Sequence, residues 1–346
     1  MKLPGLIDPH VHMREPGAIH KEDWSSGTAA ALAGGFTQVL AMPNTQPPIV
    51  DEMTLVQAYH LAEGKARCDY AQYIGAALDN VSSAAICANR CAGMKLYLDQ
   101  TYGPLRLDSM SDWMGHFRSW PADRPLVVHA EGRTLAAAIL MASLVDRPIH
   151  LAHVATREDI LIVREAKMHG LKVTCEVTPH HLFLTNEDLS GGWGEVRPVL
   201  GSRADVDALW ANLDVIDCFA TDHAPHTRAE KANADPPPGF PGLETALPLF
   251  LTAVHQGRLT LADVVERMSS NVRRIFRIPE QHDTWIEVDL DAQSTITADR
   301  MYTKAGWTPY EGCKTYGAVR KVVLRGEVVM EDGEVLAQPG FGRRIR

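Results

Sequence analysis

The sequence predicts an α/β protein, a (β/α)8 TIM-type barrel with a small β-rich appendage formed by the C-terminal tail. Eight short apolar runs alternate with helical stretches at a spacing of roughly 30 residues, the length of a βαβ unit. The runs are continuously apolar, as in parallel strands buried on both faces. The pattern becomes strand-like near residue 283, which predicts a barrel over 1–283 and the appendage over 284–346. A doubly wound open sheet is the alternative.

The strand-like runs are short and rich in apolar residues, whereas the helical stretches are longer. In chain order the runs cover 3–8, 36–42, 68–76, 93–98, 126–130, 149–153, 171–176 and 216–221. The helical stretches cover 24–33, 54–64, 81–91, 108–120, 133–145, 157–169, 205–212, 242–255 and 261–276. This alternation predicts a parallel sheet with helices outside it.

The tail has a different character. Residues 284–290 and 321–330 are strand-like, and the second run leads through Glu331-Asp332-Gly333 into Glu334-Val335-Leu336, which predicts a hairpin with a glycine turn. Before the tail, the Pro/Gly-rich segment 235–242 follows the eighth run, and its prolines predict a fixed loop.

Composition excludes several classes of protein. Hydrophobic residues make up 45% of the 346 residues, enough for a large core. The formal net charge of −9 argues against a protein that binds nucleic acid or an anionic membrane. The sequence shows neither a secretory signal nor a long apolar span. The six cysteines are scattered without a CxxC pair, which favours free thiols in a reducing compartment and a cytoplasmic location.

Polar side chains lie where the predicted strands end. They are His10 and His12 in the first run, Lys95 in the fourth, His129 in the fifth, His153 in the sixth and Asp222 after the eighth. The carboxyl ends of barrel strands share one mouth, so these side chains are expected to converge. Taken singly, a histidine is often an ordinary hydrogen-bonding residue, Asp222 fits a helix N-cap and Lys95 fits a buried salt bridge. Together they predict a metal site, and imidazole with carboxylate favours zinc.

Lys95 is unusual because an ammonium group is costly to bury in an apolar strand. A lysine that has reacted with carbon dioxide becomes a carbamate, an anion with two oxygens that can bridge two cations. The sequence therefore suggests a pair of metal ions joined by this side chain.

Several motifs carry a resemblance to a known family. The segment Pro4-Gly-Leu-Ile-Asp-Pro-His-Val-His12 resembles the opening signature of the amidohydrolase superfamily. The cyclic amidase branch, and dihydroorotase in particular, is matched by the following motifs: His12-Met-Arg-Glu-Pro-Gly17, Met42-Pro-Asn-Thr45, Gly93-Met-Lys-Leu-Tyr97, Val128-His-Ala-Glu131, Val173-Thr-Cys-Glu-Val-Thr-Pro-His-His181, Gly194-Glu-Val-Arg-Pro198, Ala220-Thr-Asp-His-Ala-Pro-His226 and Pro236-Pro-Pro-Gly-Phe-Pro-Gly-Leu-Glu244. The match covers nearly the whole chain and is greatest to the dihydroorotase domains of animal multifunctional CAD polypeptides.

The resemblance implies a cofactor of two Zn²⁺ per chain, bridged by N6-carboxylysine at Lys95. By resemblance, His10, His12, Lys95 and Asp222 hold one zinc, and Lys95, His129 and His153 hold the other. Asp222 is then also the catalytic residue, which takes a proton from the attacking water and passes it to the leaving ring nitrogen.

The resemblance also implies a substrate site. Arg14, Asn44 and His226 resemble the clamp for the substrate carboxylate, with Arg197 and the main chain of Pro238 as further contacts. Residues 99–108 resemble a mobile loop in which Thr101 and Tyr102 close over the substrate, although the animal pattern has Phe in place of Tyr102. From the residues alone, Arg14 also fits a surface ion pair with Glu15 or Glu22, Asn44 fits a turn, and 99–108 fits a plain surface loop.

One departure from the animal pattern concerns a third zinc. That pattern has Cys just before the sixth-strand histidine, as partner of the glutamate that corresponds to Glu176. Here the position is Ala152, and Cys175 is expected to point to the opposite face of its strand from Glu176. We therefore expect Glu176 to mark a residual third-metal position that stays empty.

The sequence thus predicts a zinc-dependent dihydroorotase, a hydrolase that interconverts N-carbamoyl-L-aspartate and L-dihydroorotate in pyrimidine biosynthesis. The alternatives are a dihydropyrimidinase, hydantoinase or allantoinase, and a non-catalytic amidohydrolase-fold scaffold. By analogy we expect a homodimer, neighbouring domains of a multifunctional polypeptide, and an excised domain that begins with an added Met1.

Overall fold

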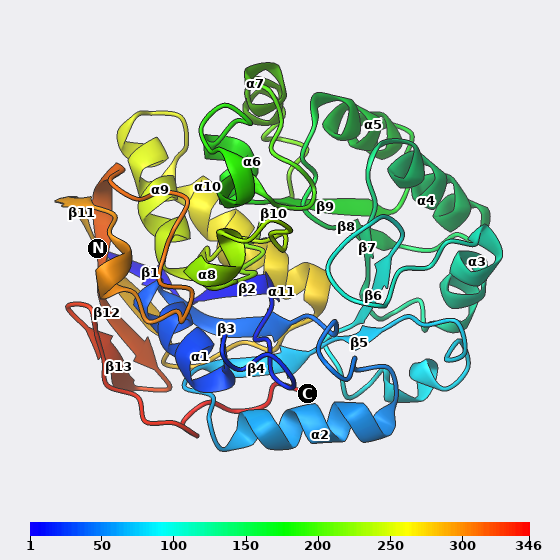
Figure 1. Cartoon of the computed structure of the whole chain (residues 1–346), viewed down its shortest axis with the longest axis horizontal. Coiled ribbons are helices and arrows are strands. Elements are labelled where there is room, and N and C mark those ends of the chain that lie inside the picture. Colours follow the sequence, from blue (N-terminus) through cyan, green and yellow to red (C-terminus); the bar gives the residue numbers. More distant parts are fainter.

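The computed structural model covers residues 1–346 and contains two sheets of parallel strands (Figure 1). Their strands are β2 (Leu6–Val11), β3 (Phe36–Ala41), β4 (Asp69–Gln72), β5 (Ile74–Gly75), β6 (Met94–Tyr97), β7 (Leu126–His129), β8 (Ile149–Leu151), β9 (Val173–Val177) and β10 (Cys218–Phe219). One sheet has the order β2-β3-β4 and the other the order β10-β9-β8-β7-β6-β5. Every adjacent pair in both is parallel, as the apolar runs predicted.

The two parallel sheets meet at both edges. At one edge, only Tyr73 separates β4 from β5. At the other, Val11 at the end of β2 forms a parallel bridge with His223, and the His12 amide donates to the His223 carbonyl at 2.8 Å. The buried Asp8 carboxylate strengthens this second edge, because it accepts hydrogen bonds from the amide and the hydroxyl of Thr221.

Helices follow most of the parallel strands, and Figure 1 shows α2 to α5 around the outside of the strands. The helices are α1 (Trp24–Ala33), α2 (Glu52–Glu63), α3 (Met110–Ser119), α4 (Gly132–Leu144), α5 (Arg157–Met168), α6 (Pro179–Phe183), α7 (Arg203–Ala211), α8 (Arg228–Lys231), α9 (Leu243–His255), α10 (Leu261–Val265) and α11 (Asn271–Phe276), with the short turns η1 (Ala84–Cys87), η2 (Gly191–Gly194), η3 (Glu266–Ser270, a π-helix) and η4 (Ala298–Arg300). Asp23 and Asp51 begin α1 and α2 with capping boxes that satisfy free amide groups. No helix combines the length and the apolar character needed to cross a membrane.

The predicted helix over 81–91 is wrong, since only the single 3-10 turn η1 forms there. The Asn80 side chain accepts from the Ala77 amide and donates to the carbonyls of Val50 and Gly75, which ties the segment to the preceding loop. The short helices α6 and α8 were not predicted.

The first predicted run, 3–8, divides at Gly5. Residues of β1 (Lys2–Pro4) pair antiparallel with β11, and only β2 joins the parallel strands. A side chain at position 5 would meet the Thr37 hydroxyl at 2.3 Å, so glycine permits the close crossing between the two sheets. The antiparallel sheet is therefore not formed by the tail alone.

This five-stranded antiparallel sheet has the order β1-β11-β12-β13-β14. Its tail strands are β11 (Trp285–Thr295), β12 (Lys314–Leu324), β13 (Glu327–Glu331) and β14 (Glu334–Val335). The predicted run 321–330 is broken by a turn at Arg325 and Gly326, which both have positive φ. The predicted hairpin is confirmed: β13 and β14 pair across Asp332 (φ 47°) and Gly333 (φ 87°).

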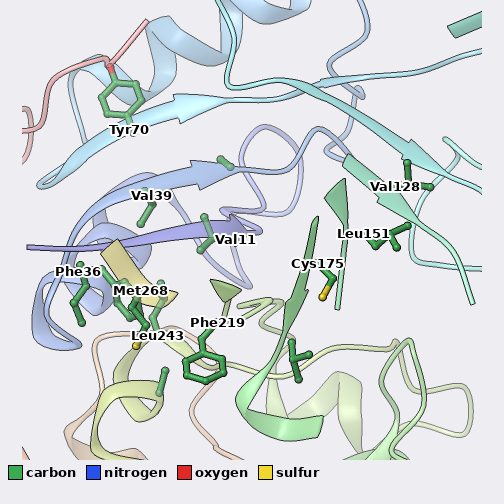
Figure 2. Close-up of a cluster of buried hydrophobic side chains, with 14 of the residues drawn as sticks. Val11, Phe36, Val39, Tyr70, Val128, Leu151, Cys175, Phe219, Leu243 and Met268 are labelled. Atoms are coloured by element: carbon green, nitrogen blue, oxygen red, sulfur yellow. The ribbon is translucent and has the colours of Figure 1, made fainter. Parts of the chain in front are cut away.

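The core explains which way the strand residues face. Figure 2 shows Val11, Val128, Leu151 and Cys175 as part of a buried cluster that also contains Phe219, Leu243 and Met268. Because successive side chains of a strand point to opposite faces, the residues next to these apolar ones point the other way. Because Val11, Val128 and Cys175 are buried in this cluster, His10, His129 and Glu176 point to the opposite face of the parallel sheets.

Candidate metal centre

Three of the predicted metal ligands, His10, His12 and His153, lie around a fourth, Asp222. The Asp222 Oδ1 atom is 3.3 Å from His10 Nε2 and 3.1 Å from His12 Nε2. Donor atoms of His10, His153 and Asp222 all lie within 4.8 Å of one another, and all three residues are buried. No helix starts at Asp222, so the N-cap interpretation is not supported.

The other predicted ligands form the second half of the centre. Lys95 is fully buried, and its Nζ atom has neither a hydrogen bond nor a salt bridge. His129 Nδ1 and His153 Nε2 are 2.9 Å apart, His129 Nε2 lies 3.4 Å from Glu131 Oε1, and His153 Nδ1 makes no hydrogen bond. Bare polar atoms inside a protein are costly, and bound metal ions would satisfy them. The donor set therefore fits a metal centre.

Charge and burial shift the pKa values within this cluster. Burial lowers the pKa of Lys95 to about 8, against the opposing charges of Glu176 and Asp222. A larger neutral fraction favours carboxylation, because the neutral amine is the form that reacts with carbon dioxide. Burial alone would raise the pKa of Asp222, but His10 and His12 hold it well below its usual value. Asp222 is therefore a carboxylate at neutral pH.

Hydrogen bonds orient His10, which lies in β2, and His12, which lies just after it. His12 Nδ1 donates to Asn44 Oδ1 at 2.8 Å, and His10 Nδ1 contacts Glu176 Oε1 at 2.5 Å. With Nδ1 carrying the proton, each Nε2 would be free to offer its lone pair to a bound metal ion. Asn44 therefore supports a metal ligand as well as facing the cavity described below.

Glu176 marks the expected residual third-metal position, and each of its two carboxylate oxygens contacts a histidine. Its second oxygen is 3.1 Å from His150 Nε2, and His150 Nδ1 is 2.8 Å from the Thr174 hydroxyl. Burial raises the pKa of Glu176, but His10 and His150 lower it overall far below its usual range. Sequence reasoning missed His150, which carries no motif signal of its own.

The sixth strand supplies no thiol beside Glu176, and Cys218, which pairs in register with Glu176 from β10, is a buried thiol whose pKa burial raises well above its usual value. Ala152 is buried and offers no donor atom. The Cys175 Sγ atom lies 3.4 Å from the Val215 carbonyl within the apolar core, as its position on the strand predicted.

Three residues of the site have left-handed backbone conformations. The φ angles are 58° at Arg14, 34° at His153 and 46° at Asp222. Non-glycine residues at positive φ are strained, and such strain is concentrated at functional sites. The backbone therefore places these side chains where a relaxed strand end would not.

One small cavity brings most of the predicted substrate residues together with the metal centre. Its lining includes His12, Arg14, Asn44, Thr101, Tyr102, Arg197, Asp222 and Pro238. His226 lies beside the cavity, with its Nε2 atom 3.1 Å from Arg14 Nη2 and 2.9 Å from the Pro238 carbonyl. Of the loop 99–108, Thr101 and Tyr102 line this cavity, whereas several of the other residues are exposed.

Arg14 is buried and has no carboxylate partner. Glu15 pairs with Lys65, and Glu22 contacts His223, so the surface ion-pair interpretation of Arg14 is wrong. Its Nε donates to the Pro225 carbonyl at 3.1 Å, which orients the guanidinium. Arg197, by contrast, is paired with Glu195 at 2.5 Å.

Comparisons with known proteins show what the whole chain is similar to. A family model described as "Dihydro-orotase-like" matches residues 1–138. The chain is 55% identical over its whole length to "Multifunctional protein CAD" of Squalus acanthias, of which it spans only 16%. It is 41% identical to "Dihydroorotase" of Pyrococcus abyssi, where 99% of this chain matches 86% of the relative.

Two solved structures share the fold. "L-Hydantoinase (Dihydropyrimidinase) from Arthrobacter aurescens" superposes with a TM-score of 0.93 at 25% identity, covering all of this chain and 88% of that one. The "Inactive dihydroorotase-like domain of Chaetomium thermophilum CAD-like multifunctional protein" superposes with a TM-score of 0.87 at 29% identity, covering 100% and 99%.

The fold and the buried donor set together define the class of the cyclic amide hydrolases. Within that class, similarity over nearly the full length of a Pyrococcus relative decides the family. The chain belongs to the dihydroorotase family.

Proposed function

We propose that the chain is a zinc-dependent dihydroorotase, which reversibly cyclises N-carbamoyl-L-aspartate to L-dihydroorotate in pyrimidine biosynthesis. The identity to dihydroorotases supports this activity. We also propose that the two parallel sheets, which meet at both edges, form one closed (β/α)8 barrel with the antiparallel sheet as an appendage.

The metal centre in this proposal holds two Zn²⁺. His10, His12 and Asp222 would hold one ion, His129 and His153 the other, and carboxylated Lys95 would bridge them. When bound, the ions would polarise the ring carbonyl and lower the pKa of water.

The chain's own residues would then bind substrate and move a proton. Asp222, an ionised carboxylate beside His10 and His12, accepts the proton of the attacking water at Oδ1. In the protonated form it donates that proton to the ring nitrogen that leaves. Arg14 offers a planar pair of N–H donors to the substrate carboxylate, which holds the ring against Asp222.

The observation that carries the proposal is a cavity lined both by the Asp222 carboxylate and by Arg14, a buried arginine that forms no salt bridge. A buried cation without a protein anion calls for an anionic ligand. The test is ring opening of dihydroorotate by the zinc-loaded protein, with dihydrouracil and hydantoin as matched rings without the carboxylate. Preferential turnover of dihydroorotate is expected.

Two alternatives remain as outcomes of the same test. Equal turnover of dihydrouracil would favour the hydantoinase type, to which the fold is similar. No turnover of any ring by metal-loaded protein would favour the scaffold, in line with the similarity to an inactive domain. The six retained donor residues argue against that scaffold role.

We further propose that the chain acts in the cytoplasm as a homodimer and as one domain of a multifunctional polypeptide. Its relatives support the last point, because the chain spans 16% of two multifunctional proteins that it matches.

The Arg14→Met variant tests the carboxylate clamp. Removing one partner of a buried charge pair is expected to lower kcat/KM for dihydroorotate by about 2–5 kcal/mol in transition-state stabilisation, with a marked rise in KM. Metal content is expected to stay unchanged. The exposed Arg320→Met, far along the chain in β12, is the matched control. Unchanged kcat/KM in Arg14→Met would exclude the clamp.

The metal count tests the role of Ala152. Because both oxygens of Glu176 contact histidines and Ala152 has no donor, two zinc ions per chain are expected. Ala152→Cys adds a thiolate beside Glu176 and is expected to admit a third, whereas Ala152→Ser, which is similar in size, is expected to admit none. Three equivalents of zinc in the unmodified protein would contradict this prediction.

A further inference from the structure

Lys21 is a buried cation beside the substrate cavity, and no sequence motif predicts a role for it. It lies in the segment between β2 and α1 and is 4% exposed. Its ammonium group has three acceptors around it: Glu230 Oε1 at 2.9 Å, His226 Nδ1 at 3.0 Å and the Tyr102 hydroxyl at 3.3 Å. An ammonium group has three N–H donors, so all of them have partners.

The contacts of its two ring nitrogens, with Lys21 and with the Pro238 carbonyl, determine where His226 carries its proton. An ammonium group can only donate, so His226 Nδ1 must be the acceptor and lack a proton. Burial, Arg14 and Lys21 also lower the pKa of His226 far below its usual value, so the ring is neutral. In a neutral imidazole the single proton then sits on Nε2, where it points to the Pro238 carbonyl.

This arrangement puts two donors side by side. His226 Nε2–H and Arg14 Nη2 are 3.1 Å apart, and because both carry protons they do not hydrogen-bond to each other. A carboxylate oxygen that approached this pair would accept from Arg14 and would share the Nε2–H of His226 with the Pro238 carbonyl, so the two adjacent donors suit a carboxylate. If His226 carried its proton on Nδ1 instead, Nε2 would present a lone pair and repel that carboxylate.

The third donor of Lys21 fixes the closing segment. Tyr102 lies with its ring 5.2 Å from the Arg14 guanidinium and edge-on to His226, also at 5.2 Å between centroids. Asn44 Nδ2 holds the Tyr102 carbonyl at 2.8 Å, and Lys21 holds the hydroxyl at the other end of the side chain. The hydroxyl at this position therefore has a partner within the site.

We propose that Lys21 is a positioning residue that keeps the proton of His226 on Nε2 and anchors Tyr102 over Arg14, so that the cavity selects a ring bearing a carboxylate. The identity of that ring rests on the proposed function, whereas the tautomer of His226 does not.

The first test is direct observation of the tautomer. In protein labelled with ¹⁵N-histidine, long-range ¹H–¹⁵N spectra distinguish Nε2–H from Nδ1–H, and the His226 signals are assigned by their loss in His226→Asn. We expect Nε2–H in the unmodified protein and a mixture of both forms in Lys21→Met. Nδ1–H in the unmodified protein, or no change in Lys21→Met, would overturn the proposal.

The second test separates the two contacts by kinetics. Lys21→Met is expected to raise KM for dihydroorotate at least ~10-fold, with a smaller effect on kcat and none on the slow turnover of dihydrouracil. Tyr102→Phe keeps the ring and the His226 tautomer, and it is expected to raise KM less than Lys21→Met does. A fall in kcat for both substrates in Lys21→Met, with KM unchanged, would indicate a merely structural role.

Lys21→Met leaves Glu230 without its ammonium partner, so the double variant with Glu230→Gln guards against loss of folding. It is expected to reproduce the tautomer change and the KM effect of Lys21→Met. A protein that turns over no dihydroorotate would refute the proposed function, while the His226 spectra would still decide the role of Lys21.

Discussion

Replacement of Lys95 by alanine is expected to remove most of the bound zinc and most of the activity. Lys95 is fully buried, its Nζ atom makes no hydrogen bond, and its charge contributes to lowering the pKa of both His129 and His153. A plain ammonium group at this position would repel cations held by those histidines. A carbamate would instead supply the anion that both metal ions share, and alanine cannot supply it.

Lys95→Met is the second variant, because methionine has a similar length and keeps the core filled. It is expected to fold and to lose metal as Lys95→Ala does, while Lys172→Ala at an exposed salt bridge is expected to leave both unchanged. Protein prepared with ¹³C-bicarbonate is expected to show a carbamate carbon resonance that both Lys95 variants lack. Full zinc content and near-normal turnover in either variant would exclude the carbamate bridge.

The clustering of the candidate metal ligands could be predicted because their positions follow from the strand pattern. His10, His129 and Asp222 stand where parallel strands end, and strand ends of one sheet meet along one edge. The apolar neighbours Val11 and Val128 are buried on the other face, as alternation along a strand requires. The fold class and the donor set therefore depend on short-range regularities that a sequence displays.

The surroundings of the site could not be predicted in the same way. Lys21 belongs to the polar stretch His20-Lys-Glu-Asp23, which has the composition of a solvated loop. It is buried because Tyr102 and α8 with Glu230 pack against it from distant parts of the chain. Contacts of this kind depend on how loops fold over the strand ends, and no periodicity encodes them.

Local side-chain contacts explain the errors in the predicted elements. The stretch 81–91 has an apolar pattern compatible with a helix, but Asn80 binds three main-chain groups before it and only one 3-10 turn follows. The division of the first run depends on the crossing of β1 and β2 at Gly5, which a single run of apolar residues does not reveal.

Replacing Asp222 by asparagine is expected to lower turnover by at least ~10²-fold while the fold and part of the metal content are retained. The amide keeps the size of the carboxylate and one oxygen, so it can still contact His10 and His12. It cannot accept and release the proton that must pass from water to the ring nitrogen. The left-handed φ of 46° at position 222 is also tolerated in the variant, because asparagine adopts this conformation as readily as aspartate.

The measurement is kcat at saturating zinc, together with its dependence on pH. Because His10 and His12 hold the pKa of Asp222 well below its usual value, folding is favoured by its ionised form above the pKa of an unfolded aspartate. This contribution to stability is lost only as the pH falls below the pKa of an unfolded aspartate toward the depressed pKa of the folded state. The asparagine variant lacks the contribution at every pH.

Asp217→Asn is the control for the loss of an aspartate elsewhere. Asp217 pairs with Lys167 outside the cavity, so this variant is expected to keep near-normal kcat. Near-normal kcat in Asp222→Asn with full zinc content would show that another group carries the proton.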